Sequence, residues 1–227
     1  MMTGLCVKQR ESAVSLADVE RFRTLPVANI SDVMSRMSAG GARLRPLHRE
    51  GVLIGPALTV RTRPGDNLMV HKALDMAVPG DVIVVDAGGD LTNALIGELM
   101  IAYARYKGVA GIVINGAVRD YAAISEGNFP IFAAGVTHRG PYKDGPGEVN
   151  VPISLDGMVI HPGDLMVGDL DGLVAVPQDE VDAIYRAASA KHQAEEAQLA
   201  AIARGENQRA WVDKALRAIN CPGVEGA

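Results

Sequence analysis

Two short runs of uninterrupted apolar residues lie in the middle of the chain, and a polar segment with glycine follows each of them. The runs cover residues 82–85, before the segment 86–90, and residues 109–114, before Asn115-Gly116. An apolar run without alternation is typical of a strand that is buried on both faces. A helical pattern lies between the two runs, and a second one precedes a third short strand. This β-α-β-α-β order predicts an α/β fold with parallel strands at the centre of the sheet.

Segments with helical spacing surround the two runs. Residues 67–77 carry apolar side chains at helical intervals. Residues 91–107 are also predicted to be helical, but Gly97 interrupts them, so the helix could instead begin there. The other predicted helices are residues 16–23, 30–37 (capped by Asn29 or Ser31), 118–126 and 178–219, the last broken near Gly205. The other predicted strands are residues 52–62, with a break or bulge at Gly55-Pro56, and 131–134, 151–154, 158–160, 165–167 and 172–176.

These elements divide the chain into three parts. Residues 1–25 form an N-terminal segment, and residues 26–180 form the α/β domain. Residues 181–227 form a helical region rich in Ala, Glu, Gln and Arg, which we expect to pack on a neighbouring subunit.

Composition excludes several classes of partner. The 227 residues include 22 Lys and Arg against 27 Asp and Glu, a net charge of −5, and only 4% are aromatic. A general binder of nucleic acids or anionic membranes would be basic, and a base-stacking surface would need aromatic rings. We therefore expect no nucleic-acid and no membrane partner. Two distant cysteines, Cys6 and Cys221, and the lack of a signal-like or membrane-spanning stretch predict a cytoplasmic location.

The pair Arg119-Asp120 is the first candidate for chemistry. It follows a predicted buried strand and a glycine turn, and ligands of open α/β sheets bind beyond the carboxyl ends of the strands. Arg119 could hold a planar carboxylate through two hydrogen bonds, and Asp120 could hold Mg²⁺ or Mn²⁺. The plain alternative is an arginine and an aspartate in the first turn of a helix.

Glu98 is the second candidate, because its carboxylate lies among apolar residues and would be costly to bury without a partner or a metal. If the helix begins at Gly97, the free N–H groups of Leu99 and Met100 would face an anionic ligand. The alternative is an exposed glutamate on the polar side of a longer helix.

Other catalytic motifs are weak or absent. Gly88-Gly89 follows a strand, but there is no G-x-G-x-x-G fingerprint, P-loop or nucleophile elbow. His71, on a predicted helix, is expected to be packed or capping. His138, in the glycine- and proline-rich loop 137–148, has a better chance of touching a substrate. Lys72 alone has an apolar helical context, which gives a Schiff-base mechanism little support.

Several motifs, in order, carry a resemblance that runs from about residue 25 to residue 200. They are Gly65-Asp66-Asn67-Leu68, Pro79-Gly80-Asp81-Val82-Ile83-Val84-Val85-Asp86, Asn115-Gly116-Ala117-Val118-Arg119-Asp120, Arg139-Gly140-Pro141-Tyr142-Lys143 and Gly168-Asp169-Leu170-Asp171-Gly172. With them the chain resembles the RraA-like family, close to its class II 4-hydroxy-4-methyl-2-oxoglutarate/4-carboxy-4-hydroxy-2-oxoadipate aldolases. The resemblance implies a swivelling β/β/α domain, related in shape to phosphohistidine domains. It also implies a homotrimer or homohexamer with active sites between subunits.

The resemblance further implies roles for single residues. Asp120 matches the residue that ligates Mg²⁺ or Mn²⁺ in the aldolases, and Arg119 matches the arginine that binds pyruvate and its enolate. Glu98 matches an acidic residue that holds a water on the cation.

The same resemblance extends to the neighbouring backbone and to a second subunit. Gly97, Leu99 and Met100, together with Glu98, match the segment that binds pyruvate. Asp32 and Glu195 match two catalytic carboxylates from a neighbouring subunit, with Glu196 as an alternative to Glu195.

The implied activity is that of a lyase. It would cleave a 4-hydroxy-2-oxo acid such as 4-hydroxy-4-methyl-2-oxoglutarate through a pyruvate enolate, with oxaloacetate decarboxylase activity beside it. The alternative is a non-catalytic regulator of ribonuclease E activity. As the family pattern stands, regulators tend to lack the acid after the motif arginine, so Asp120 favours the enzyme. A methyltransferase is a third reading, suggested only by labels on relatives.

Overall fold

The computed structural model describes residues 4–38 and 40–224 of the chain. The chain divides into two compact units, Met1–Ala188 and Ser189–Ala227. The predicted boundary after residue 180 falls at the start of α6 (Val181–Ala203), whereas the division between the compact units falls inside this helix. Packing of residues 181–227 on a neighbouring subunit stays a prediction.

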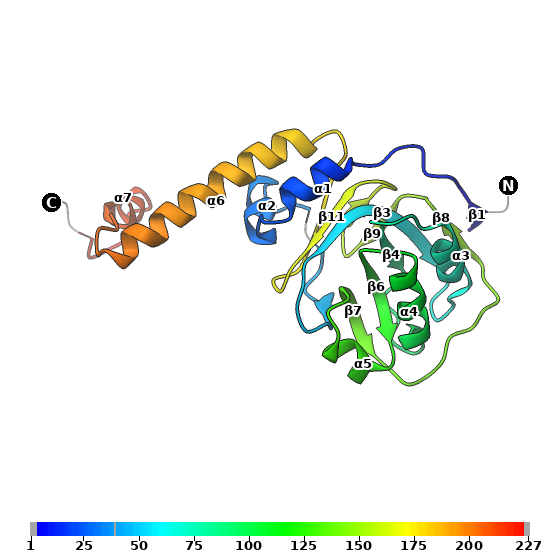
Figure 1. The fold of residues 1–227 in the computed structure, drawn as a ribbon. Coiled ribbons are helices and arrows are strands. Elements are labelled where there is room, and N and C mark those ends of the chain that lie inside the picture. Colours follow the sequence, from blue (N-terminus) through cyan, green and yellow to red (C-terminus); the bar gives the residue numbers. More distant parts are fainter. Residues whose placement is uncertain (1–3, 39, 225–227) are drawn as a thin grey trace. The chain divides into compact units, whose positions relative to one another are not determined.

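Parallel strands form the centre of the first unit, as predicted (Figure 1). The main path of this ten-stranded sheet contains β1 (Leu5–Val7), β2 (Arg45–Pro46), β3 (Leu53–Thr62), β4 (Val82–Asp86), β6 (Gly111–Val118), β7 (Ile131–Val136) and β8 (Gly147–Val149). The neighbours β3, β4, β6 and β7 run parallel to one another. β8 and β1 extend the sheet beyond β3, and β2 pairs with β7. The predicted α/β class is therefore confirmed.

Three helices cover one face of this sheet. They are α3 (Leu68–Met76), α4 (Glu98–Tyr106) and α5 (Tyr121–Glu126). Figure 1 shows α3 and α4 in front of the strands, and the two helices contact each other. Their buried side chains, such as Leu74 and Ile101, share a core with Ile83 and Ile112 of the strands. A second core on the other face lies under the hairpin of β9 (Ile153–Leu155) and β10 (Met158–Ile160).

The long strand β3 passes through Gly55-Pro56 without the predicted break. Its first half pairs antiparallel with β11 (Leu165–Gly168), which in turn pairs with β12 (Leu173–Val176). A Cβ at Gly55 would lie 2.1 Å from the carbonyl oxygen of Gly80. Glycine is therefore needed here for a close backbone approach and not for a bulge.

The first predicted helix is confirmed as α1 (Leu16–Phe22), which Ser15 and Asp18 begin with a capping box. The second was placed too late, because α2 (Val27–Val33) begins at Val27, directly after Pro26, and no side chain caps it. Pro26 is the N-cap residue: its backbone is extended, with ψ 140°, and its carbonyl accepts a hydrogen bond from the N–H of Ile30 at 3.2 Å. Asn29 and Ser31 lie inside the helix and do not cap it.

The second unit consists of helical chain, as predicted. It holds the later part of α6 and all of α7 (Ala210–Ala218). Gly205, between the two helices, has a φ of +74°, a left-handed conformation that glycine adopts at little cost. Among the residues that the structure describes, no helix combines the length and the apolar character needed to cross a membrane.

Candidate functional site

Two strand ends bring Gly97 and Arg119 together. The predicted helix over residues 91–107 is wrong in its first part, because Ala94–Ile96 forms a short buried strand, β5. β5 pairs in parallel with the end of β6, and the backbone N–H of Arg119 donates to Ile96 O at 3.0 Å. β6 reaches Val118, beyond the predicted end at residue 114. Gly97 and Arg119 are the next residues of the two strands and lie side by side at the carboxyl edge of the sheet.

Gly97 has no room for a side chain. A Cβ there would lie 2.3 Å from Asp120 Oδ2 and 2.9 Å from Arg119 Cγ. The φ of Gly97 is −151°, which any residue can adopt, so the requirement for glycine is one of space. The backbone of Gly97 thus packs directly against both motif side chains.

Asp120 has an unusual backbone conformation, and a hydrogen bond holds its carboxylate in place. Its φ is +59°, in the left-handed region that few non-glycine residues occupy. Its Oδ2 accepts a hydrogen bond from the backbone N–H of Glu98 at 2.8 Å and lies 3.8 Å from Arg119 Nε. Asp120 precedes α5 but interacts with the start of α4, so the plain alternative of a first-turn pair on one helix is wrong.

The start of α4 offers further donors. The helix begins at Glu98, directly after Gly97, which agrees with the prediction of a helix start at Gly97 and not with a longer helix from residue 91. Leu99 and Met100 are its second and third residues, and N–H groups at these positions have no partner within a helix. They lie at the positive end of the helix dipole, where an anionic group is favoured.

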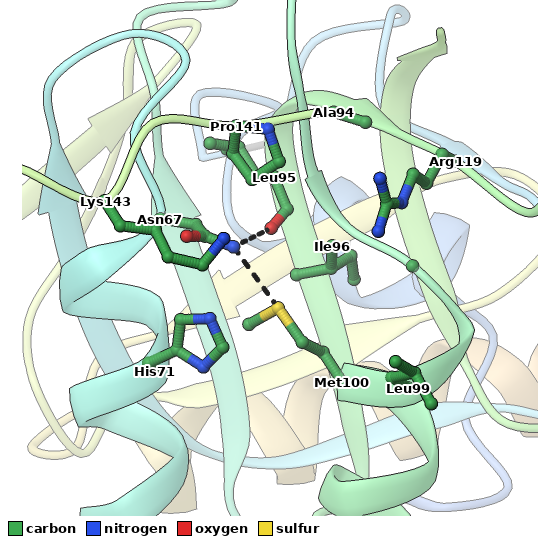
Figure 2. Close-up of a pocket in the computed structure, with 11 residues that line it drawn as sticks. Asn67, His71, Ala94, Leu95, Ile96, Leu99, Met100, Arg119, Pro141 and Lys143 are labelled. Carbon is green, nitrogen blue, oxygen red and sulfur yellow. Dashed lines mark hydrogen bonds between the residues drawn. The ribbon is translucent and has the colours of Figure 1, made fainter. Parts of the chain in front are cut away.

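A cavity of about 200 Å³ opens beside these residues (Figure 2). Its volume is several times the roughly 30 Å³ that one water molecule occupies in the liquid. α3, β5, the start of α4, the end of β6 and the loop after β7 each contribute to the wall. The lining residues are Asn67, His71, Ala94, Leu95, Ile96, Gly97, Leu99, Met100, Arg119, Pro141 and Lys143.

His71 lines this cavity, whereas the sequence pattern had indicated a packed or capping residue. Burial lowers the pKa of His71 below its ordinary value, and the nearby charge of Lys143 lowers it further, against an opposing effect of Asp75. The imidazole is therefore neutral at pH 7 and carries one N–H donor.

Asp66 ties the loop that carries Lys143 to the start of α3. Its carboxylate is buried and accepts backbone N–H groups of Leu68, Asp144 and Gly145 at 2.9, 2.7 and 2.8 Å. Burial by itself would raise the pKa of Asp66, but these hydrogen bonds and the charge of Arg63 lower it overall. The position of Lys143 at the cavity is thus fixed by a neighbouring, fully bonded carboxylate.

Asn67 makes only part of the hydrogen bonds that its amide allows. Its Nδ2 donates to Leu95 O at 2.8 Å and contacts Met100 Sδ at 3.4 Å. Its Oδ1 is buried and has no hydrogen-bond partner among the described residues. Reversing the amide would place an oxygen against the carbonyl of Leu95, so the free acceptor is a property of the site.

The structure brings together five of the residues that the resemblance implied. Gly97, Leu99, Met100 and Arg119 line the cavity, and Asp120 is in contact with Gly97. Asp120 also lines a shallow depression with Arg119, Thr137 and His138, which places His138 beside the motif pair.

Three other implied residues lie elsewhere in the chain. The side chain of Glu98 is exposed and lines a separate groove with Ile101 and Arg105. Asp32, on α2, pairs with Arg36 at 2.8 Å, and Glu195, in the second unit, pairs with Lys191 at 2.8 Å. Their assignment to the site of a neighbouring subunit stays a prediction.

Asn67, His71 and Lys143 were not predicted as site residues from the sequence, although all three line the cavity. The signal was present in part, because Asn67 and Lys143 belong to the motifs 65–68 and 139–143. His71 follows Asn67 by one helical turn, and this spacing places both on one face of α3.

Comparison with known proteins places the chain in a family. The model of the RraA-like family, described as Aldolase/RraA, matches residues 27–175. The chain belongs to the RraA-like family, as the sequence motifs predicted. This match includes Gly97, Arg119 and Asp120.

Individual proteins are similar to this chain in sequence and in fold. A protein of Halalkalibacterium halodurans named "Putative 4-hydroxy-4-methyl-2-oxoglutarate aldolase" is 41% identical over 199 residues, which are 87% of this chain and 95% of that protein. An uncharacterized protein of Pseudomonas syringae superposes with a TM-score of 0.77 at 28% identity, over 86% of this chain and 96% of that one. The RNA-processing inhibitor RraA from Thermus thermophilus superposes with a TM-score of 0.62 at 33% identity, over 67% and 93%.

Proposed function

We propose that this protein is a pyruvate-releasing lyase, a class II aldolase that cleaves a 4-hydroxy-2-oxo acid such as 4-hydroxy-4-methyl-2-oxoglutarate. The observation that carries the proposal is the contact of Arg119 and Asp120 with Gly97 at the mouth of a small cavity. The similarity to the named aldolase of Halalkalibacterium halodurans supports the same class of reaction.

Arg119 and the start of α4 would bind the pyruvyl part of the substrate. The guanidinium can hold a carboxylate and the 2-oxo oxygen, and the N–H groups of Leu99 and Met100 add donors. When the bond between C3 and C4 breaks, the electron pair moves into the pyruvyl part and negative charge gathers on its 2-oxo oxygen. Donors that already point at this oxygen stabilise the charge without reorganisation, which lowers the barrier.

Asp120 would hold the divalent cation that the family resemblance implies. Among the described residues, no group of three or more His, Cys, Asp and Glu side chains could hold a metal. A single carboxylate such as that of Asp120 does not suit zinc, which prefers several Cys or His ligands. Mg²⁺, in contrast, is often held by one or two carboxylates with several waters. The Oδ1 of Asp120 makes no hydrogen bond with the described residues, so it can serve a hard cation. A bound Mg²⁺ or Mn²⁺ would polarise the 2-oxo group and offset the developing charge.

The C4 hydroxyl must lose its proton as the bond breaks, and the pyruvyl carbon must later gain one. The cavity lining includes no Asp or Glu. We therefore propose that Glu98, which stands between the lining residues Gly97 and Leu99 in the chain, acts together with Asp32 and Glu195 of a neighbouring subunit. On this proposal the protein is a homo-oligomer, a trimer or a hexamer, and the proton transfer depends on assembly.

The same arrangement predicts a second activity. Loss of CO₂ from oxaloacetate leaves the same pyruvate enolate, so Arg119 and the α4 donors would stabilise it in the same way. We expect oxaloacetate decarboxylase activity with the same dependence on Arg119.

The test is pyruvate release from 4-hydroxy-4-methyl-2-oxoglutarate and from oxaloacetate, with Mg²⁺ and then with a chelator. We expect chelator-sensitive release by the wild type and a loss of at least about 100-fold in Arg119→Ala. Arg49→Ala is the matched control, because Arg49 is exposed and pairs only with the neighbouring Glu50 among the described residues. Equal activity of Arg119→Ala and Arg49→Ala would refute the proposed role of the cavity.

A non-catalytic regulator of a ribonuclease is the second candidate function. It is supported by the similarity to the RNA-processing inhibitor RraA. Asp120 supports the enzyme, because the family resemblance implies that regulators tend to lack the acid after the motif arginine. Inhibition of a ribonuclease by both wild type and Asp120→Ala, together with no pyruvate release from either substrate, would favour the regulator.

A further inference from the structure

Two turns with the sequence Pro-Gly-Asp fold in the same way. They are residues 79–81 and 162–164, and they lead into the strands β4 and β11. The glycine of each turn is left-handed, with φ of +94° in the first and +91° in the second. Each aspartate carboxylate accepts the backbone N–H of the residue three positions earlier, at 3.0 Å for Asp81 and 2.8 Å for Asp164. The two aspartates therefore occupy equivalent positions.

The partners of these two carboxylates differ in charge. Oδ1 of Asp81 accepts a hydrogen bond from Nη1 of Arg10 at 2.7 Å. Oδ1 of Asp164 accepts only the backbone N–H of Gln178, at 3.3 Å. Nδ1 of His161 lies 3.6 Å from Oδ2 of Asp164, but an imidazole is a cation only when it is protonated. Asp164 therefore lacks the permanent cation that its counterpart has.

The other buried acidic side chains of the described chain each have an arginine. The pairs are Asp66–Arg63, Asp81–Arg10 and Glu148–Arg61. Asp164 is only 4% exposed and forms no ion pair with an arginine or lysine among the described residues. An ionised carboxylate is costly to bury unless a cation offsets its charge. Burial raises the pKa of Asp164 above its ordinary value, against hydrogen bonds from His161 and Gln178.

Asp164 lies at a second cavity, with a volume of about 560 Å³. The lining residues are Ser12, Ser38, Gly157, Val159, His161, Asp164, Pro177, Gln178 and Asp179. They include two carboxylates and neither arginine nor lysine, and none of them lines the cavity at Arg119. Asp179 is exposed and makes no side-chain hydrogen bond or ion pair with the described residues. The charge of this lining favours a cation.

The remaining groups of the lining suit an organic cation with a short alkyl chain. The hydroxyl groups of Ser12 and Ser38 can accept hydrogen bonds from its N–H groups. Val159 and Pro177 offer apolar side chains to the alkyl chain, and the side chain of Val159 is exposed. Arginine is the partner of all the other buried acids, and its planar guanidinium matches the geometry of a carboxylate. A guanidinium is therefore the cation that fits best.

We propose that this cavity binds a small alkylguanidinium compound whose charge pairs with Asp164. The ligand would stand to Asp164 as the side chain of Arg10 stands to Asp81. Asp179 would add a second, weaker attraction from the exposed side of the cavity. The proposal goes beyond the proposed lyase reaction and does not rest on it, because the two cavities share no lining residue.

The test compares two probes of nearly the same shape. Butylguanidinium carries the charge, and butylurea is its neutral counterpart. Calorimetric titration of the full-length protein at millimolar probe concentrations measures both affinities. A hydrogen bond to a charged group predicts a preference of about 10- to 100-fold for butylguanidinium in the wild type.

Two variants locate this preference. In Asp164→Asn we expect most of it to vanish through weaker binding of butylguanidinium, with butylurea unchanged. Asp164 is buried, so a second variant, Asp179→Asn, changes an exposed side chain of the same cavity and should weaken butylguanidinium binding severalfold without affecting the fold. Asp75→Asn is the matched control, because it removes the same charge from an exposed position of α3 that does not line this cavity.

The proposal is overturned if the wild type binds the two probes equally, if it binds neither, or if folded Asp164→Asn keeps the preference. If Asp164→Asn does not fold, Asp179→Asn decides, and an unchanged affinity for butylguanidinium overturns the proposal. A capped peptide with a single arginine is the third probe, because a guanidinium can also belong to another protein. Tighter binding of butylguanidinium than of the peptide upholds a small ligand, whereas tighter binding of the peptide overturns it.

Discussion

Oδ2 of Asp120 accepts the backbone N–H of Glu98 at 2.8 Å, which joins the residue after the motif arginine to the first residue of α4. The two residues lie 22 positions apart in the sequence. Through this bond the carboxylate of Asp120, the guanidinium of Arg119 and the free N–H groups of α4 share one location. The geometry of the candidate site depends on it.

Gly97→Ala should disrupt this arrangement. The new Cβ would lie 2.3 Å from Asp120 Oδ2, so the carboxylate must move away from the start of α4. A displacement of about 1 Å in a site can lower activity by roughly 100-fold, and we expect a loss of this size in pyruvate release. Gly140→Ala is the control, because its Cβ would meet Arg119 only at 3.5 Å, an ordinary contact. Full activity of Gly97→Ala would contradict the crowding.

Asp120→Asn separates the charge of this residue from its hydrogen bond. Asparagine tolerates the left-handed backbone and can still accept the N–H of Glu98. We therefore expect a thermal midpoint close to that of the wild type, together with weaker Mn²⁺ binding and about 100-fold less pyruvate release. Calorimetric titration with Mn²⁺ measures the first effect without reference to activity. Unchanged Mn²⁺ affinity would remove Asp120 from the metal site.

Asp66 should make folding stability depend on pH at the acid end. The pKa of Asp66 is lowered below 3.8 in the folded protein, so the folded state favours the ionised form. Its contribution to stability is complete above the unfolded pKa and is lost as the pH falls through the folded pKa. Asp66→Asn should lower the thermal midpoint at pH 7 and flatten its decline on acidification from pH 5 to pH 3 (about the range of the ordinary aspartate pKa). Parallel pH profiles for the two proteins would contradict this role.

His71 should titrate below its ordinary pKa of 6.5. Burial is the main cause, and the positive charge of Lys143 acts in the same direction, whereas Asp75 opposes it. Lys143→Gln should therefore raise the pKa of His71, and Asp75→Asn should lower it further. A pH titration of the ring signals by NMR measures all three values. An unchanged pKa in Lys143→Gln would show that the two side chains do not face the same cavity.

Local patterns predicted the elements whose determinants are local. The apolar runs before Asp86 and Asn115 form central strands, as their short length and the turn residues that bound them predicted. The capping box of α1 and the glycine after α6 are likewise features of neighbouring residues. The motif around Arg119 directly follows an apolar run, so the sequence alone placed this arginine at the carboxyl edge of the sheet.

Non-local contacts explain what the sequence did not reveal. Ala94–Ile96 has helical spacing, but it becomes a strand because the extended end of β6 offers it hydrogen bonds. This pairing lies outside any local pattern. α2 begins at Val27, earlier than predicted, and Asn29, which was predicted as a cap, lies buried inside the helix.

By itself the sequence determined the α/β class, the family and the pair Arg119-Asp120, since buried strands and motif residues leave a mark in the local order of side chains. Only the tertiary structure decided that Gly97 supports this pair and that His71 and Lys143 face the same cavity. These residues come from separate elements, and the physical cause of their meeting is strand pairing and the buried bonds of Asp66, which act across the chain.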